Sequence, residues 1–240
     1  MDTTSYIALS RQTVLQRQLT NIAHNIANST TTGFQAEHMV FETYLERSGE
    51  PRKLAYVQDV ATIRQLDGGP IIETGNDLDL AIDGNGYFPV QTGNGVGYTR
   101  AGQFQLNTVG QIVTPAGMPL LDQGNQPITV PPGAGQLSIA DDGTITSQLG
   151  VLGRIAPVTF ANEQAMERVG DNILTTEQAP IPAADAAVKQ GYLENSNVQS
   201  ILEITRLMDT VRAFEGTQRM IETHHELSRR TVERVLSSGG

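Results

Sequence analysis

The chain has 240 residues, of which 38% are hydrophobic and 5% aromatic, with no Trp and no Cys, and its formal net charge is −10. The absence of Cys excludes disulfides, Cys-based zinc sites and thiol nucleophiles, and the excess of acidic over basic residues argues against a nucleic-acid partner. The N-terminal stretch MDTTSYIALSRQ lacks the basic and apolar regions of a secretory signal, and no apolar run approaches the ~20 residues of a membrane helix, so we expect neither a cleaved signal peptide nor a membrane-embedded segment.

The first predicted element is an amphipathic helix over residues 4–28. Its apolar positions recur at alternating steps of three and four residues when one Gln is included, which is the repeat of a narrow helical seam. The polar stretch NIANSTTTGF ends the helix, and we expect Asn28, Gly33 and Phe34 to form a hinge, because Gly tolerates a positive φ. The seam positions are Ala8, Gln12, Leu15, Leu19, Ile22 and Ile26.

The next predicted elements are a connector and a β-rich block. Residues 35–69 are irregular, with some strand character around residues 56–63. In residues 70–190 the stretch DLDLAIDGNGYFPV alternates Leu and Ile with Asp and then turns at Asp-Gly-Asn-Gly. FQLNTVGQIV and LSIADDGTIT repeat the pattern of strand, turn and strand. Short strands at this spacing predict an antiparallel sandwich or barrel.

The last predicted element is a long helix over about residues 197–236. The tetrapeptide SNVQ, Ser196 to Gln199, matches a capping box at its start. At about 1.5 Å per residue the helix would be roughly 60 Å long, which does not suit a compact single-domain monomer. Its seam follows the alternating three and four steps of a heptad repeat. The seam positions are Ile204, Leu207, Val211, Phe214, Gln218, Ile221, His225, Ser228, Val232 and Val235.

The order of these elements predicts an α+β fold in which helices flank a central all-β domain. We divide the chain into an N-terminal assembly helix and hinge (1–34), an extended connector (35–69), a β-rich outer domain (70–190) and a C-terminal assembly helix (191–240). Neither seam is closed by its own neighbourhood in the sequence. The two helices are therefore expected to pair with each other as a coiled coil, or with copies of themselves and of related chains.

No residue pattern points to a catalytic, cofactor or metal site. The adjacent His224 and His225 would point about 100° apart on a helix, and the i,i+4 spacing of a zincin is missing. Asp77 and Asp79 share one face of a strand, without the spacing of an EF-hand. The stretch GNGVG lacks the following helix of a dinucleotide-binding loop and is interpreted as a hairpin tip. We expect a protein that is not an enzyme.

Three long stretches resemble the signatures of the flagellar rod, hook and hook-associated axial proteins. NIAHNIANSTTTGFQAEHMVFE is similar to the N-terminal signature of this family. GGPIIETGNDLDLAIDGNGYFPVQT and YTRAGQFQLNTVGQIVTPAGMPLL resemble its β-domain signature, and QGYLENSNVQSILEITRLMDTVRAFEGTQRMIE resembles its C-terminal signature. The departures are small: His24 and Gln35 replace the usual Asn and Lys, and Pro89 follows the aromatic pair.

The resemblance implies a structural subunit of the bacterial flagellar rod that transmits torque from the motor to the hook. It implies export by the flagellar type III apparatus, assembly in the periplasm, and contacts with copies of itself and with other rod proteins, without a cofactor. Two alternatives remain at this point. A glycan-binding β-domain with helical spacers would keep its binding after removal of both termini, and an enzyme would need convergent acids or a nucleophile.

Overall fold

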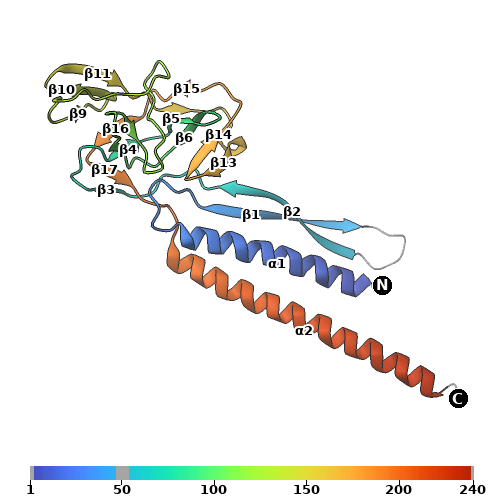
Figure 1. The fold of residues 1–240 in the computed structure, drawn as a ribbon. Helices are drawn as coiled ribbons and strands as arrows, with labels where there is room; N and C mark the ends of the chain where they lie inside the picture. The colour runs from blue at the N-terminus through green and yellow to red at the C-terminus, as the bar shows by residue number, and fades with distance from the viewer. Residues whose placement is uncertain (1–2, 47–53, 239–240) are drawn as a thin grey trace. The chain divides into compact units, whose positions relative to one another are not determined.

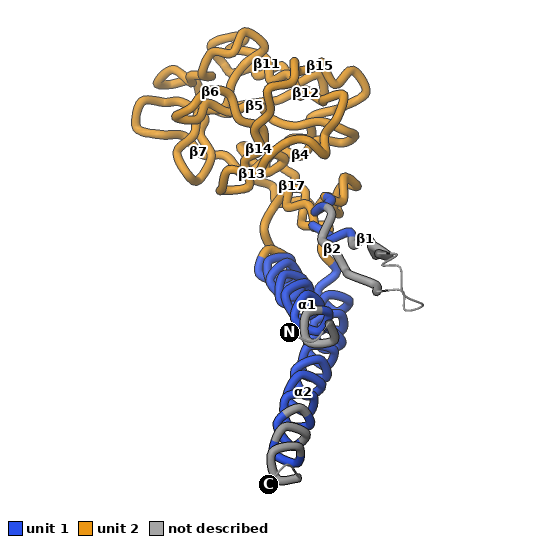
Figure 2. The backbone as a smooth tube through the Cα atoms, turned by 90° about the vertical axis from the view of Figure 1, so that its right-hand side faces the viewer, with its two compact units in different colours: residues 1–27, 37–63, 199–240 blue, residues 28–36, 64–198 orange. Residues whose placement is uncertain are grey.

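The computed structural model describes residues 3–46 and 54–238 (Figure 1). Within the helices and strands, side chains are not described for residues 3–6, 41–46, 54–60, 228, 231–232 and 235–238. The chain divides into two compact units, coloured separately in Figure 2. Unit 1 consists of residues 1–27, 37–63 and 199–240, and unit 2 consists of residues 28–36 and 64–198.

Unit 1 contains the two long helices. Helix α1 (Thr3–Ala27) and helix α2 (Ser200–Ser238) lie side by side and run in opposite directions (Figure 1). Strands β1 (Glu37–Glu46) and β2 (Leu54–Arg64) form a two-stranded sheet, and β1 lies against α1. Both helices are close to their predicted ranges, and the predicted connector contains two long strands.

Helix α2 begins later than the sequence predicts, and the expected capping box does not form. The hydroxyl of Ser196 accepts a hydrogen bond from the N–H of Val198 at 3.2 Å, so it closes a short turn before the helix. The carbonyl of Gln199 accepts from the N–H of Glu203 at 3.0 Å, which makes Gln199 the residue that precedes the first helical turn. The side chain of Asn197 is bonded to other segments of unit 2, and this holds the intervening backbone outside the helix.

Unit 2 is built from short antiparallel strands. Its largest sheet has the order β13-β14-β6-β5, a second has the order β11-β10-β9, and the remaining strands pair as β12-β15, β16-β4, β17-β3 and β7-β8. A single 3₁₀ turn at Glu163–Ala165 precedes β13. The strands are β3 (Ile71–Glu73), β4 (Leu80–Asp83), β5 (Phe88–Thr92), β6 (Gly95–Thr99), β7 (Gln105–Leu106), β8 (Ile112–Val113), β9 (Ser138–Ile139), β10 (Thr144–Ser147), β11 (Gly150–Arg154), β12 (Val158–Thr159), β13 (Glu167–Gly170), β14 (Ile173–Thr175), β15 (Ile181–Pro182), β16 (Ala187–Gln190) and β17 (Tyr192–Glu194).

The first and last strands of unit 2 are neighbours. Ile71 of β3 pairs with Glu194 of β17, and Leu80 of β4 pairs with Gln190 of β16. The unit is therefore closed by strands that are more than a hundred residues apart in the chain. This closure places the segment after α1, the segment before β3 and the segment before α2 within reach of one another.

The larger of two clusters of buried hydrophobic residues in unit 2 forms its main core. The alternation of the DLDLAID stretch is reproduced only in part: Leu80 and Ile82 are buried and Asp83 is exposed, but Asp79 and Ala81 are buried as well. The predicted hairpin tip at GNGVG joins β5 to β6. Burying these aliphatic and aromatic side chains is the main term that stabilises the unit. Among the core residues are Phe88, Val90, Phe104, Ile112, Leu120, Ile128, Ile139, Ile145, Ile155, Ile173 and Val188.

Candidate assembly surfaces

The seam predicted for α1 lies on its covered face. Ala8, Leu15 and Ile22 are buried, with at most 9% of each residue exposed, and Leu19 and Ile26 are half-buried. Because α1 packs beside α2 and β1 in unit 1, these apolar positions are covered within the chain's own fold.

The covered face of α2 mixes apolar with polar residues. Three of its predicted seam positions, Leu207, Phe214 and Ile221, are half-buried. The buried positions that alternate with them are polar. Successive covered positions are four and three residues apart in turn, as on a helix that packs along one partner. We call this the covered face of α2: Glu203, Leu207, Thr210, Phe214, Thr217 and Ile221.

Two threonines on the covered face satisfy their hydroxyls within their own helix. The hydroxyl of Thr210 donates to the carbonyl of Arg206 at 2.7 Å, and that of Thr217 donates to the carbonyl of Ala213 at 2.9 Å. A buried hydroxyl that is bonded this way leaves no unpaired donor at the helix interface. Thr210 and Thr217 can therefore pack on α1 as small side chains.

Another apolar stripe of α2 is exposed. Ile204 and Val211, which the sequence places on the seam, are 42% and 37% exposed. Ile201 and Met208 continue this stripe at steps of three and four residues and are 81% and 56% exposed. We call Ile201, Ile204, Met208 and Val211 the α2 stripe. Exposed apolar stripes of this kind are typical of interaction surfaces.

The remaining predicted positions of α2 lie near its C-terminal end. Gln218 and His225 are exposed. Val232 and Val235 belong to the helix, but their side chains lie outside those that the structure describes. The predicted seam of α2 is thus divided between a covered face and an exposed stripe.

The predicted hinge residues lie in unit 2. Gly33 has a φ of +63°, and a Cβ at this position would be 2.4 Å from the backbone nitrogen of Ala101. Its N–H donates to the carbonyl of Glu194 at 2.7 Å. The ring of Phe34 is buried, and the Arg168 guanidinium lies 4.5 Å from the ring centroid. Asn28 begins the segment, and its carbonyl accepts from the N–H of Thr31.

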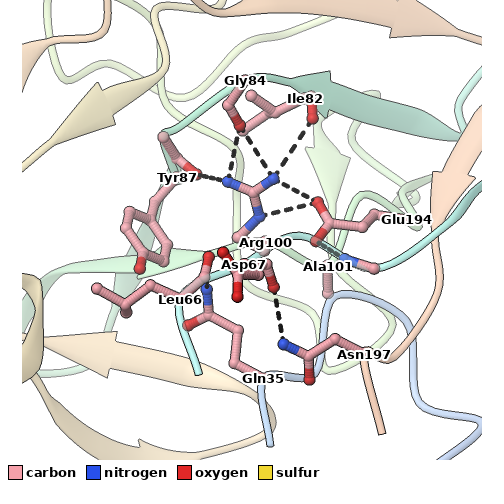
Figure 3. A network of polar contacts seen from close by, with 12 residues as sticks. Gln35, Leu66, Asp67, Ile82, Gly84, Tyr87, Arg100, Ala101, Glu194 and Asn197 are labelled. Atoms are coloured by element: carbon pink, nitrogen blue, oxygen red, sulfur yellow. Dashed lines mark hydrogen bonds and ion pairs between the residues drawn. The ribbon is translucent and has the colours of Figure 1, made fainter. Parts of the chain in front are cut away.

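Asn197 joins three segments of unit 2, as Figure 3 shows in part. Its side-chain oxygen accepts from the N–H of Ala36 at 2.7 Å. Its side-chain nitrogen donates to the carbonyls of Gln65 and Asp67 at 3.0 and 2.7 Å. Its own N–H donates to the carbonyl of Phe34 at 3.3 Å. The segment after α1 and the segment before α2 are therefore fixed to each other through one amide side chain.

A buried ion pair between Arg100 and Glu194 lies beside this amide (Figure 3). The Nη2 and Nε atoms of Arg100 approach one carboxylate oxygen at 2.6 and 2.8 Å, and both side chains are at most 6% exposed. The other carboxylate oxygen accepts from the N–H of Gly69 at 3.0 Å. Such a pair is stable only when its other hydrogen bonds are also made. The guanidinium makes them with the carbonyls of Ile82, Gly84 and Gly86.

Tyr87 extends these polar contacts to the second, smaller cluster of buried side chains, which consists of Tyr87, Tyr98, Phe160, Met166 and Leu174. Its hydroxyl donates to the Glu163 carboxylate at 2.9 Å. Burial, together with the negative charge of Glu163, raises the pKa of Tyr87 to about 12. The Arg64 guanidinium donates to the side-chain oxygen of Gln35 at 3.2 Å and to the carbonyl of Glu163. Gln35, in the segment after α1, is thereby connected to Tyr87 through Arg64 and Glu163.

The sequence did not reveal Arg100, Glu194 and Asn197 as structural centres. A single Arg and a single Glu separated by 94 residues carry no spacing that predicts a pair. The only local signal is that each stands in a stretch of otherwise apolar or turn-forming residues, YTRAG and GYLENS.

The described part of the chain contains no group of three or more metal-ligating side chains among His, Cys, Asp and Glu. None of its helices is long and apolar enough to cross a membrane. An open hollow of about 1030 Å³ lies beside the β5–β6 hairpin. Its polar lining consists of Thr, Asn, Tyr, Glu and Gln side chains, without a paired nucleophile and base. The described geometry supports packing and assembly better than bond-breaking chemistry.

Comparison with known proteins gives consistent family matches. Residues 81–147 match the model of the flagellar hook protein FlgE/F/G D1 domain, and residues 189–234 match that of the flagellar basal body rod FlgEFG protein C-terminal region. The chain is 41% identical to the flagellar basal-body rod protein FlgF of Caulobacter vibrioides over 98% of both chains. It is 34% identical to FlgF of Mesorhizobium japonicum over 90% of this chain and 91% of the relative. FlgG of Bacillus subtilis is 30% identical over 95% of this chain and 97% of the relative.

Proposed function

The chain belongs to the family of flagellar basal-body rod proteins that includes FlgF and FlgG, and on this premise we propose how it is built into the rod. It is a structural subunit and not an enzyme. We propose that it polymerises through its terminal helices into the shaft that carries torque from the motor to the hook, in the proximal rod. The glycan-binding alternative has no support among these relatives.

The observation that carries this proposal is the exposed α2 stripe. Four apolar side chains at helical spacing, between 37% and 81% exposed, remain uncovered after α1 has packed on the covered face. Covering them removes apolar surface from water, which favours association by roughly 25 cal/mol per Å² of apolar area. A second helix of a neighbouring axial subunit has the period that matches this stripe.

Within the subunit, we propose that α1 and α2 form a coiled-coil pair. The alternating steps of three and four residues on both covered faces support this packing. We further propose that the small sheets of unit 2 together form an antiparallel sandwich or barrel. Support comes from the core, because strands from β4 to β16 contribute to one hydrophobic cluster.

We place the hinge of the subunit at Asn28. Gly33 and Phe34 are held in unit 2 by backbone contacts and by burial, whereas Asn28 directly follows the last residue of α1. The predicted assembly surface then comprises Leu15, Leu19, Ile22, Ile26, Leu207, Phe214 and Ile221 within the helix pair. Ile204 and Val211 are its outward part, with Val232 and Val235 near the end of α2.

We propose that the partners are other copies of this chain, the other proximal-rod proteins and the distal-rod protein. Rod proteins of this family assemble with one another in the basal body, which supports this choice of partners. The family also implies delivery by the flagellar type III export apparatus without a cleaved signal peptide, and a final position in the periplasmic part of the basal body.

The test is a strain from which the gene has been deleted, with its basal bodies purified and imaged. We expect basal bodies that stop within the rod and cells that do not swim, and we expect the wild-type chain to restore both. Complete basal bodies and normal swimming in the deletion strain would overturn the proposal.

A further inference from the structure

Two faces of α2 could each pack on α1. The sequence favours a face that includes Ile204 and Val211, whereas the structure covers Glu203 and Thr210 instead. The two faces share Leu207 and other positions, so they differ by a rotation of roughly 50° about the helix axis, half of the 100° per residue of an α-helix. By apolarity alone, α1 should pack on the face with Ile204 and Val211. Some contact therefore favours the more polar face.

Asn25 of α1 makes that contact. The residue is completely buried, and its amide nitrogen donates to the carbonyl of Glu37 at 2.8 Å and to the Glu203 carboxylate at 3.4 Å. Its side-chain oxygen accepts from the N–H of Glu37 at 3.0 Å. Asn25 therefore bonds to β1 as a neighbouring strand would, and has one donor left, which it directs at α2.

Glu203 completes the arrangement from the first turn of α2. It is 4% exposed, and its second carboxylate oxygen lies 2.6 Å from the guanidinium of Arg206. If α2 turned to bury Ile204 and Val211, Glu203 would move away from Asn25. A buried amide that loses a partner destabilises that arrangement, which opposes the gain from the apolar side chains.

We propose that Asn25 and Glu203 select the face of α2 that packs on α1 and so leave the α2 stripe free for a neighbouring axial subunit. A single buried polar pair is known to fix helix register and partner choice at a cost in stability. The inference rests on the proposed function, because it assumes that the stripe is used in the rod. Asn25 and Glu203 are positioning residues. Their contact keeps α1 from packing on the α2 stripe of the same chain.

The test compares Asn25→Asp, Glu203→Gln and the double variant in the deletion strain, with the amount of chain in purified basal bodies as the readout. Asn25→Asp would place a carboxylate against the carbonyl of Glu37 and the carboxylate of Glu203, so we expect at least about a tenfold loss of incorporation. Glu203→Gln keeps an acceptor for Asn25, so this variant should stay within about twofold of wild type. In the double variant the Gln amide can donate to the carboxylate introduced at position 25, and incorporation should recover to within about threefold.

The matched control is Gln16→Glu, which adds one negative charge to an exposed position of α1 and should incorporate as wild type does. Immunoblots of whole cells correct for the amount of each chain made. Wild-type incorporation of Asn25→Asp would overturn the inference, and so would a double variant no better than Asn25→Asp. Absence of the wild-type chain from basal bodies would instead overturn the proposed function, so the two failures are distinguishable.

Discussion

At the scale of single residues, Arg100 and Glu194 hold the ends of unit 2 together. The pair is buried, and every other polar contact that the two side chains need comes from backbone groups of unit 2. When one partner of such a pair is removed, the other remains as an uncompensated buried charge. The pair is therefore a sensitive point of unit 2, although replacing both partners together need not destabilise it.

We predict that Arg100→Met lowers the free energy of unfolding of unit 2 by about 3–5 kcal/mol, because Glu194 loses its buried counter-ion. Denaturant unfolding, followed by the near-ultraviolet signal of the tyrosines, measures this. The control is Arg154→Met, which removes a partner from an ion pair that is more than half exposed on both sides and should cost at most about 1 kcal/mol. Equal effects of the two substitutions would show that the Arg100 pair has no special role.

The hydroxyl of Tyr87 gives unit 2 a dependence on alkaline pH. Its pKa is raised from 10.0 to about 12 in the folded chain, so folding favours the neutral phenol. The stabilisation is fully present below pH 10 and is lost as the pH rises toward 12. We predict that the difference in unfolding free energy between wild type and Tyr87→Phe shrinks over this window, as measured by denaturant unfolding at several pH values. A difference independent of pH would contradict the prediction.

The residue scale also shows what sequence patterns can predict. Gly33 was recognisable because a glycine after a helix end is a local signal, and its positive φ agrees with it. Asn197 was not, because its partners Ala36 and Asp67 are brought to it by the pairing of β3 with β17. A role that depends on long-range closure leaves no trace in the spacing of neighbouring residues.

At the scale of elements, α2 has two neighbouring faces, one covered within unit 1 and one exposed. The period of its apolar residues predicted a long helix correctly. The same period could not decide which of two faces packs on α1. The two faces share half of their positions and differ by a rotation of only about 50° about the helix axis, so both fit the pattern. The deciding contact, from Asn25 to Glu203, spans 178 residues. The sequence therefore predicts helix α2 well. Which of its faces packs on α1 can be predicted only when the contacts with α1 are known.

We predict that Leu207→Asp or Phe214→Asp abolishes incorporation into the rod and motility, while unit 2 stays folded. Either substitution would place a charge without a partner on the covered face of α2. Immunoblots of purified basal bodies and a swimming assay measure the effect, and amide hydrogen exchange of β4, β5 and β16 in the purified chain checks unit 2. Thr223→Asp, at an exposed position of α2 that belongs to neither face, is the control. Normal swimming of the Leu207 variant would contradict the packing of the helices.

At the scale of the whole molecule, the two units should differ in stability before assembly. Unit 2 has a large core and a closed set of strands. The helices of unit 1 share a seam that includes buried Glu, Asn and Thr side chains, so their pairing gains less from burial. Helices that lack a fully apolar partner are marginal in water.

We predict that, in the free chain, amide hydrogens of residues 5–28 and 200–235 exchange much faster than those of the core strands of unit 2, because the helix pair is marginally stable and opens often until incorporation stabilises it. Hydrogen exchange of the purified chain, read by mass spectrometry, measures this. The strands β4, β5 and β16 serve as the internal reference. Slow exchange throughout both helical segments would show that the helix pair is already stable in the free subunit.

The account as a whole depends on whether the α2 stripe becomes covered in the rod. Because the natural chain has no Cys, Ile204→Cys introduces a single thiol into the stripe. The direct measurement is the rate of its modification by a maleimide in the free chain and in purified basal bodies, with Thr223→Cys as the reference on the same helix. We predict that the thiol at 204 reacts rapidly in the free chain and is strongly protected in the basal body, more so than the thiol at 223. Equal rates at position 204 in both states would contradict the account.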